Sequence, residues 1–320
     1  MHAHFLQGLL DRPQRAAKVS SATEALLASI TNKFPVEAHG NTVGALESLV
    51  ERVTDMNSAD DTVDDTSRLA LMGIVAIVTG AIMRHAKGGG ANSLLQKLIQ
   101  TPIIPRIGQE IGRRLQQVVA PILDQDGSLS VVLPTWKAKT YHQFVRPMLE
   151  RALPRPDVSN GELLRRLNYR VAVLGMLRWM DFAIYEDDVD MILRASICLA
   201  QGPPCEKDAA SSLWAIKTVL ERDPNAAKSH LDSLVQICQQ AIRNADSPVF
   251  HDVLLGSHAC QILALDILLL IGQKYEKDDA QIRSVATAVN RTLTIASGLG
   301  SRSIREKARL ARGLWRTIKA

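Results

Sequence analysis

The stretch that decides the fold is Asn160–Ala320, one segment of which, residues 254–275, reads LLGSHACQILALDILLLIGQKY. Similar segments recur in it at spacings of 47, 48 and 47 residues, beginning at Ser159, Glu206, Leu254 and Ser301. A period near 47 residues is typical of HEAT and armadillo repeats, whose unit is a pair of helices. Because one amphipathic hairpin cannot cover its own apolar face, each repeat must pack on the next. The sequence therefore predicts an all-α fold, a HEAT/armadillo-like α-solenoid of stacked helical hairpins.

Three hairpins are expected in this stretch. They pair Leu163–Phe182 with Asp187–Gln201, Lys207–Arg222 with Ala226–Arg243, and Leu254–Tyr275 with Asp278–Ser297. Apolar residues follow helical rather than alternating spacing, in the first helix at Leu167, Val171, Leu174, Leu177, Trp179 and Met180. The helix in 254–275 is apolar nearly all round, which predicts that it is buried between neighbours.

The final segment, 301–319, is expected to be a single capping helix. One stripe on it is apolar and consists of Ile304, Ala308, Ala311, Trp315 and Ile318. The adjoining stripe is basic and consists of Arg302, Arg305, Arg309, Arg312, Arg316 and Lys319. Spacings of three and four residues place each set on one helix face. We expect the apolar stripe to dock on the preceding hairpin and the basic stripe to face solvent, as a terminal repeat requires.

The first half of the chain is also predicted to be helical. Its expected helices are Ser20–Asn32, Thr42–Asp55, Ser67–His85, Ala91–Gln100, Pro105–Leu123 and Leu133–Leu153. Residues 55–66 contain five aspartates and no basic residue, which predicts a solvated acidic loop. Pro154-Arg155-Pro156 then marks a seam. The predicted domains are residues 1–155, with N-terminal hairpins, and 156–320, with the clearer repeats.

Composition and hydropathy narrow the class further. Only 4% of residues are aromatic and strand-favouring runs are scarce, which favours an all-helical protein. The most apolar run, Leu69–Met83, is shorter than the roughly 18 residues that a membrane-spanning helix needs, so no membrane is expected. The net charge of +5 indicates an acidic partner surface, either protein or nucleic acid.

The sequence shows no catalytic or metal-binding pattern. Its histidines are scattered, and Cys198, Cys205, Cys238 and Cys260 include no CxxC pair. We therefore expect no enzyme activity, no metal and no cofactor. The cysteines within apolar helices are expected to be small core residues, and a reducing intracellular compartment fits them best.

The basic stripe of the final helix has three interpretations. It could simply keep a terminal repeat soluble, because such repeats present a charged outer face. It could instead bind an acidic protein, since arginine is enriched at protein interfaces and Trp315 lies nearby. Direct nucleic-acid binding is less favoured, because apart from Trp315 the helix has no aromatic side chain for base stacking.

Two segments resemble a known family. The first is the helix Trp136-Lys137-Ala138-Lys139-Thr140-Tyr141 with the following residues 145–149. It is similar to an aromatic-basic-Gln-Arg-x-aromatic helix in the adaptor family named for methyl-methanesulfonate sensitivity. That family is part of the cytosolic iron–sulfur targeting complex. Residues 304–315, IREKARLARGLW, resemble that family's closing helix. Ala138 replaces the family's glutamine, and Glu306-Lys307 inverts its basic–acidic order. Family members are considerably longer, so the resemblance implies a fragment, a truncated gene model or a divergent relative.

The resemblance implies a non-catalytic HEAT-repeat adaptor in the cytoplasm and nucleus. Its partners would be the other subunits of the targeting complex and iron–sulfur client proteins of DNA repair and replication, with no cluster bound by this chain. We expect the partner-binding residues to be Arg305, Arg309, Arg312 and Arg316, with Lys137 and Lys139 second. The alternative is a general α-solenoid scaffold for nuclear transport or chromatin-associated assembly.

Overall fold

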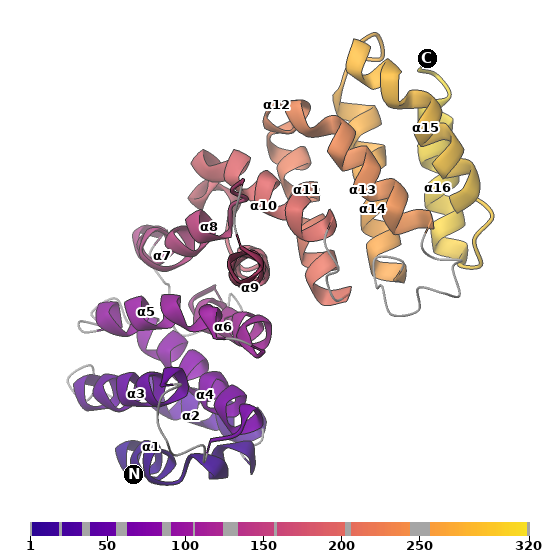
Figure 1. Ribbon diagram of the computed structural model, residues 1–320. Coiled ribbons are helices and arrows are strands. Elements are labelled where there is room, and N and C mark those ends of the chain that lie inside the picture. The colour runs from indigo at the N-terminus through magenta and orange to yellow at the C-terminus, as the bar shows by residue number, and fades with distance from the viewer. Residues whose placement is uncertain are drawn as a thin grey trace. The chain divides into compact units, whose positions relative to one another are not determined.

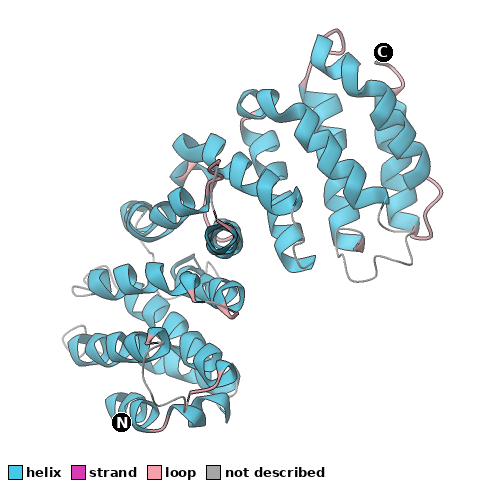
Figure 2. Ribbon diagram, viewed as in Figure 1, coloured by secondary structure: helices cyan, strands magenta, loops and turns pink. Residues whose placement is uncertain are grey.

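A computed structural model describes most of the chain and is helical throughout that part (Figures 1 and 2). The described residues are 2–18, 21–33, 39–55, 63–84, 91–104, 106–123, 134–156, 159–201, 206–243 and 257–318. These ranges contain helices, turns and bends but no strand. The prediction of an all-α protein is confirmed for them. Much of the expected acidic loop, residues 56–62, lies outside the described residues.

The chain divides into two compact units, Met1–Ile184 and Tyr185–Ala320. The division differs from the expected one at 155/156, because α9 (Asn160–Leu177) packs along α6 and α8 of the first unit. The two helices expected to form the first hairpin, α9 and α10, consequently fall in different units. The helices of the first unit before α9 are α1 (His2–Asp11), α2 (Ser21–Lys33), α3 (His39–Thr54), α4 (Asp65–Met83), α5 (Ala91–Gln100), α6 (Gly108–Leu123), α7 (Pro134–Thr140) and α8 (Arg146–Ala152).

The first unit is built from two rows of helices (Figure 1). In one row α2, α4, α6 and α9 lie side by side, and in the other α1, α3 and α5 do. The rows meet where α3 packs on α4 and α8 packs on α9. Helix α4 thus buries its apolar residues against neighbours in its own row and against α3 of the other row.

Helix α4 is the centre of this unit. It contacts α2, α3 and α6, and its residues from Leu71 to Ala76 are all buried. Asp64 caps its N-terminus by accepting a hydrogen bond from the backbone N–H of Ser67 at 2.7 Å. By length and composition α4 could cross a membrane, but 72% of its most apolar window is buried inside the protein. Its apolar residues therefore have protein neighbours already.

Two glycines allow α6 to approach α9 closely. A Cβ at Gly112 would lie 3.0 Å from the carbonyl oxygen of Asn168 and 3.2 Å from the backbone nitrogen of Ala172. At Gly108 it would lie 2.5 Å from the carbonyl oxygen of Pro102, the atom to which Asn168 Nδ2 donates a hydrogen bond at 2.7 Å. Backbone atoms cannot give way as a flexible side chain can, so this packing requires glycine at both positions.

The helix expected over Leu133–Leu153 is interrupted by one wide turn. Helices α7 and α8 are joined by a π-helical turn, Tyr141–Val145, in which the backbone N–H of Arg146 donates to the carbonyl of Tyr141, five residues back. Pro147 follows at once and has no N–H to continue the α-helical ladder. A π turn absorbs one extra residue without ending the helix.

The second unit also has two rows. Its helices are α10 (Val189–Gln201), α11 (Glu206–Arg222), α12 (Pro224–Ala227), α13 (Leu231–Arg243), α14 (His258–Lys274), α15 (Ala280–Ala296) and α16 (Arg302–Trp315). Helices α11, α14 and α16 lie side by side in one row, and α13 lies beside α10 and α15 in the other. The segment starts at Glu206 and Ser301 coincide with the start of α11 and the N-cap of α16, whereas the start at Leu254 lies outside the described residues and α14 begins at His258.

The helix pairs of this unit are shifted by one helix from the expected hairpins. The second helix of each expected hairpin packs on the helix that follows it in the sequence, instead of on the one before it. Helices that follow one another in the sequence pack together as α10 with α11, α13 with α14, and α15 with α16, whereas α11 with α14 and α14 with α16 pack along their row. Small buried side chains accompany this packing, such as Ser196 on α10 and Ser212 on α11, where the Ser212 hydroxyl donates to the carbonyl of Ser196. Small residues let two helices approach closely. The sequence period alone does not reveal which neighbouring helix these small residues face.

The apolar stripe predicted for the final helix is confirmed within the described residues, and the basic stripe only in part, because Arg302, Arg309 and Arg316 are exposed whereas Arg305 and Arg312 are half-buried. Every member of the apolar stripe is buried, and Trp315 is completely so. Asp266 on α14 adds an ionic contact, pairing with Lys307 on α16 and with Lys217 on α11 at 3.4 Å. Helix α14, expected to be enclosed, is indeed flanked by α11, α13 and α16.

Some residues are more exposed than the helical spacing predicts. Helix α9 ends at Leu177, and the chain turns before the 3₁₀ segment Phe182–Ile184, so the prediction that Trp179 belongs to the buried stripe is wrong. Its side chain is 48% exposed. Cys238 and Cys260 are buried as expected, whereas Cys198 is only half-buried. Cys205 lies outside the described residues.

Candidate functional site

The four arginines expected to bind a partner differ in their roles. Arg309 and Arg316 are exposed, and Arg312 is half-buried at the edge of the α16 packing face. Within the described part of the chain, these three guanidinium groups have no hydrogen-bond or ion-pair partner in the structure. Arg305 is already engaged, because its Nη1 donates to the carbonyl of Leu299 at 2.9 Å and to that of Gly300. Arg305 therefore supports the turn before α16.

The two lysines expected to assist them lie on α7, in the first unit. Lys139 is exposed, and its Nζ lies 5.0 Å from the ring centroid of Trp136, within the range of a cation–π contact. Lys137 is half-buried. The indole N–H of Trp136 donates to the carbonyl of Met83, which fixes α7 to the end of α4. The two lysines belong to the first unit and the four arginines to the second, so each set is a separate candidate surface.

A cleft in the first unit was not predicted from the sequence. It consists of two adjoining hollows of about 310 and 470 Å³. The first, here the apolar hollow, is lined by Val50, Glu51, Thr54, Lys97, Gln100, Ile103, Ile104 and Arg165. The second, the arginine hollow, is lined by Ile103, Pro147, Glu150, Arg151, Arg155, Glu162, Arg165, Arg166 and Tyr169. Ile103 and Arg165 line both, so the two hollows adjoin, and together they are called the cleft.

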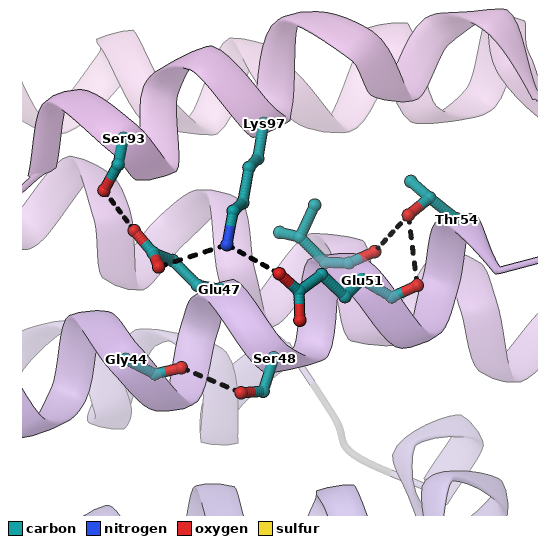
Figure 3. A network of polar contacts seen from close by, with 8 residues as sticks. Gly44, Glu47, Ser48, Glu51, Thr54, Ser93 and Lys97 are labelled. Atoms are coloured by element: carbon teal, nitrogen blue, oxygen red, sulfur yellow. Dashed lines mark hydrogen bonds and ion pairs between the residues drawn. The ribbon is translucent and has the colours of Figure 1, made fainter.

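An ionic network between α3 and α5 forms the polar side of the apolar hollow (Figure 3). Lys97 Nζ lies 2.7 Å from Glu51 Oε1 and 3.1 Å from Glu47 Oε2, and Ser93 donates to the other oxygen of Glu47. The hydrogen bond from Ser93, and secondarily Lys97, lower the pKa of Glu47 despite partial burial. The hydrogen bond to Glu51 is the main cause that raises the pKa of Lys97. Lys97 is thus neutralised by two carboxylates.

Buried hydrogen bonds hold the wall of the arginine hollow. Arg151 Nη1 donates to the Tyr169 hydroxyl at 3.0 Å, and that hydroxyl donates to the carbonyl of Ile99 at 3.0 Å. Arg166 Nη1 donates to the carbonyl of Leu153 at 2.6 Å, while its Nη2 lies 2.8 Å from Glu162. These bonds tie α9 to the ends of α5 and α8. They make the wall rigid and keep both guanidinium groups in place.

The arginine hollow carries excess positive charge. Four arginines and two glutamates line it, which leaves a formal charge of +2. Arg155, Arg165 and Glu150 are the exposed members, and Arg165 is held only by a marginal 4.0 Å contact with Glu162. Arg166 is 5% exposed, and its Nε is buried without a hydrogen-bond partner. Arg155 and Arg165 therefore remain available to an anionic group, which their guanidinium groups could bind through charge-assisted hydrogen bonds.

No local sequence pattern could have revealed this cleft. Its lining comes from α3, α5, the turn before α6, α8 and α9, which span residues 50–169. The only local signal was the run Pro154-Arg155-Pro156, interpreted as a seam, which places Arg155 at the opening of the arginine hollow.

Histidine, cysteine and carboxylate side chains in the described ranges form no group of three or more that could hold a metal ion. The candidate functional sites are the cationic surface of α16 and the cleft of the first unit. Comparison of the chain with models of known protein families gives no match, and comparison with curated proteins gives none either.

Proposed function

We propose that this protein is a non-catalytic adaptor, a HEAT-like α-solenoid that binds acidic surfaces of other proteins through α16. The observation that carries the proposal is the pair of exposed arginines, Arg309 and Arg316, beside an apolar stripe that is fully buried. Arginine forms planar, bidentate contacts with carboxylates and is enriched at protein interfaces. A stripe of unpaired cations on a well-anchored helix suits a rigid docking surface.

The specific assignment is to the cytosolic iron–sulfur targeting complex. It is supported by the resemblance of Trp136–Tyr141 and Ile304–Trp315 to that complex's adaptor family. On this proposal the chain binds other subunits of the complex and iron–sulfur client proteins, in the cytoplasm and nucleus, without holding a cluster itself. It has no enzymatic step, and it contacts neither a membrane nor nucleic acid directly.

Charge reversal on α16 tests the docking surface. Arg309→Glu/Arg316→Glu should reduce capture of purified targeting-complex subunits about tenfold in a pull-down, because it places like charges opposite an acidic partner. Lys277→Glu/Arg291→Glu is the matched control, since both residues are exposed in the same unit and the change in net charge is equal. Equal capture by both double variants would show that α16 is not part of the interface.

The alternative is a general helical scaffold for nuclear transport or chromatin-associated assembly, which has the same architecture. The two are separated by identifying the proteins that co-purify with the wild-type chain and are lost with Arg309→Glu/Arg316→Glu. Transport or chromatin factors in that set, without targeting-complex subunits, would favour the alternative.

A further inference from the structure

The cleft of the first unit has two chemically different ends. At the apolar hollow the accessible apolar side chain is that of Ile103, which is 39% exposed, while Val50 and Ile104 also line the hollow and are buried. At the arginine hollow the exposed charged groups are the guanidinium groups of Arg155 and Arg165 and the carboxylate of Glu150. Because Ile103 and Arg165 belong to both hollows, a single extended ligand can lie across the two ends.

The arrangement of charge limits the class of ligand. Glu51 lies at the apolar hollow, and Glu150 and Glu162 lie at the arginine hollow. A nucleic-acid strand carries a negative charge at every phosphate and would meet these carboxylates along the cleft. It would also find no stacking platform, because Tyr169, the only aromatic residue of the lining, is 4% exposed. A peptide with spaced carboxylates and an apolar side chain avoids both problems.

We propose that this cleft binds an extended acidic peptide segment of a partner protein, with one apolar side chain over Ile103 and carboxylates paired with Arg155 and Arg165. The cleft meets the requirements for such a site because its wall is already fixed. Arg151 and Arg166 are held by Tyr169 and by backbone carbonyls, so this part of the wall loses little conformational freedom on binding. The inference deepens the adaptor proposal by adding a second docking site, and it does not depend on α16.

The test uses the full chain and a fluorescein-labelled peptide of aspartate and glutamate with one central leucine, titrated by fluorescence anisotropy. Arg155→Glu/Arg165→Glu should weaken binding about tenfold or more, because both carboxylate partners become repulsive. The matched control is Lys33→Glu/Arg178→Glu, which makes the same charge change at exposed residues of the same unit. Arg178 lies about 20 Å from Arg165 along the axis of α9. The control should bind as the wild type does.

A second peptide, with serine in place of leucine, should bind several-fold more weakly to the wild type, because it leaves the apolar hollow uncovered. Absence of wild-type binding, equal loss in the two double variants, or equal affinity for the leucine and serine peptides would overturn the proposal. Arg309→Glu/Arg316→Glu should retain full affinity for the peptide. The experiment therefore distinguishes failure of peptide binding in the cleft from failure of partner docking on α16.

Discussion

The indole N–H of Trp315 donates a hydrogen bond to the backbone carbonyl of Leu268 at 2.8 Å, joining α16 to the middle of α14. Trp315 is completely buried. One turn further along α14, Gly272 leaves room for the ring, because a Cβ there would lie 3.0 Å from the indole nitrogen. This contact fixes the position of the helix that carries the exposed arginines.

Replacing Trp315 with alanine should therefore lower the free energy of unfolding of the second unit. Loss of the buried ring is expected to cost about 3–5 kcal/mol. Urea denaturation followed by far-UV circular dichroism measures the change. Leu310→Ala on the same helix is the control and should have little effect, since Leu310 is 63% exposed. Comparable losses in the two variants would show that α16 is not anchored by its tryptophan.

Gly112→Ala should destabilise the first unit by about 1–3 kcal/mol, because the new methyl group meets the backbone of α9. Gly44→Ala offers a matched comparison inside α3, where no atom lies within 4 Å of a built Cβ. There the better helix propensity of alanine should stabilise the protein by up to about 1 kcal/mol. Thermal melts of the two variants should shift in opposite directions, and a shift in the same direction would contradict the close packing of α6 on α9.

The network of Figure 3 predicts a pH dependence. The hydrogen bond from Ser93 holds the pKa of Glu47 below its ordinary value of 4.5. A depressed carboxyl pKa stabilises the folded state above the unfolded-state pKa, and this stabilisation is lost as the pH falls through the folded-state pKa. Ser93→Ala should therefore lose less stability than the wild type between about pH 5 and pH 3. Identical losses in urea titrations at the two pH values would exclude a role for this hydrogen bond.

Cysteine alkylation should follow burial. Burial alone raises the pKa of the Cys238 thiol far above its usual range, and Cys260 is also completely buried. Thiolate is the reactive form, so both should resist iodoacetamide in the native protein while the half-buried Cys198 reacts first. Peptide mass spectrometry in a Cys205→Ser background measures each site. Rapid native labelling of Cys238 would show that α13 opens readily.

The helical class and the two faces of α16 could be predicted because they depend on local periodicity. Residues at spacings of three and four share a face, so burial of Ile304 and Trp315 follows from the sequence itself. The end of α9 could not be predicted in the same way. Apolar residues continue to Met180, and only the turn after Leu177 exposes Trp179.

The cleft depends on contacts between distant parts of the chain. Lys97 meets Glu47 and Glu51 across 46 to 50 positions, and Tyr169 reaches the carbonyl of Ile99 across 70. No spacing rule connects such residues. The role of Arg305 was hidden for a related reason, because its carbonyl partners become visible only once the turn before α16 is known.

The wide turn at Tyr141–Val145 has a consequence for the surface that α7 presents. Deleting one residue there would restore a regular helix while α8 stayed in place, and it would turn everything N-terminal to the deletion by about 100°. The side chain of Trp136 would then point away from the carbonyl of Met83, and that of Lys139 would project in a different direction. One residue in this turn thus sets which side chains α7 displays, while the helices that follow keep their places.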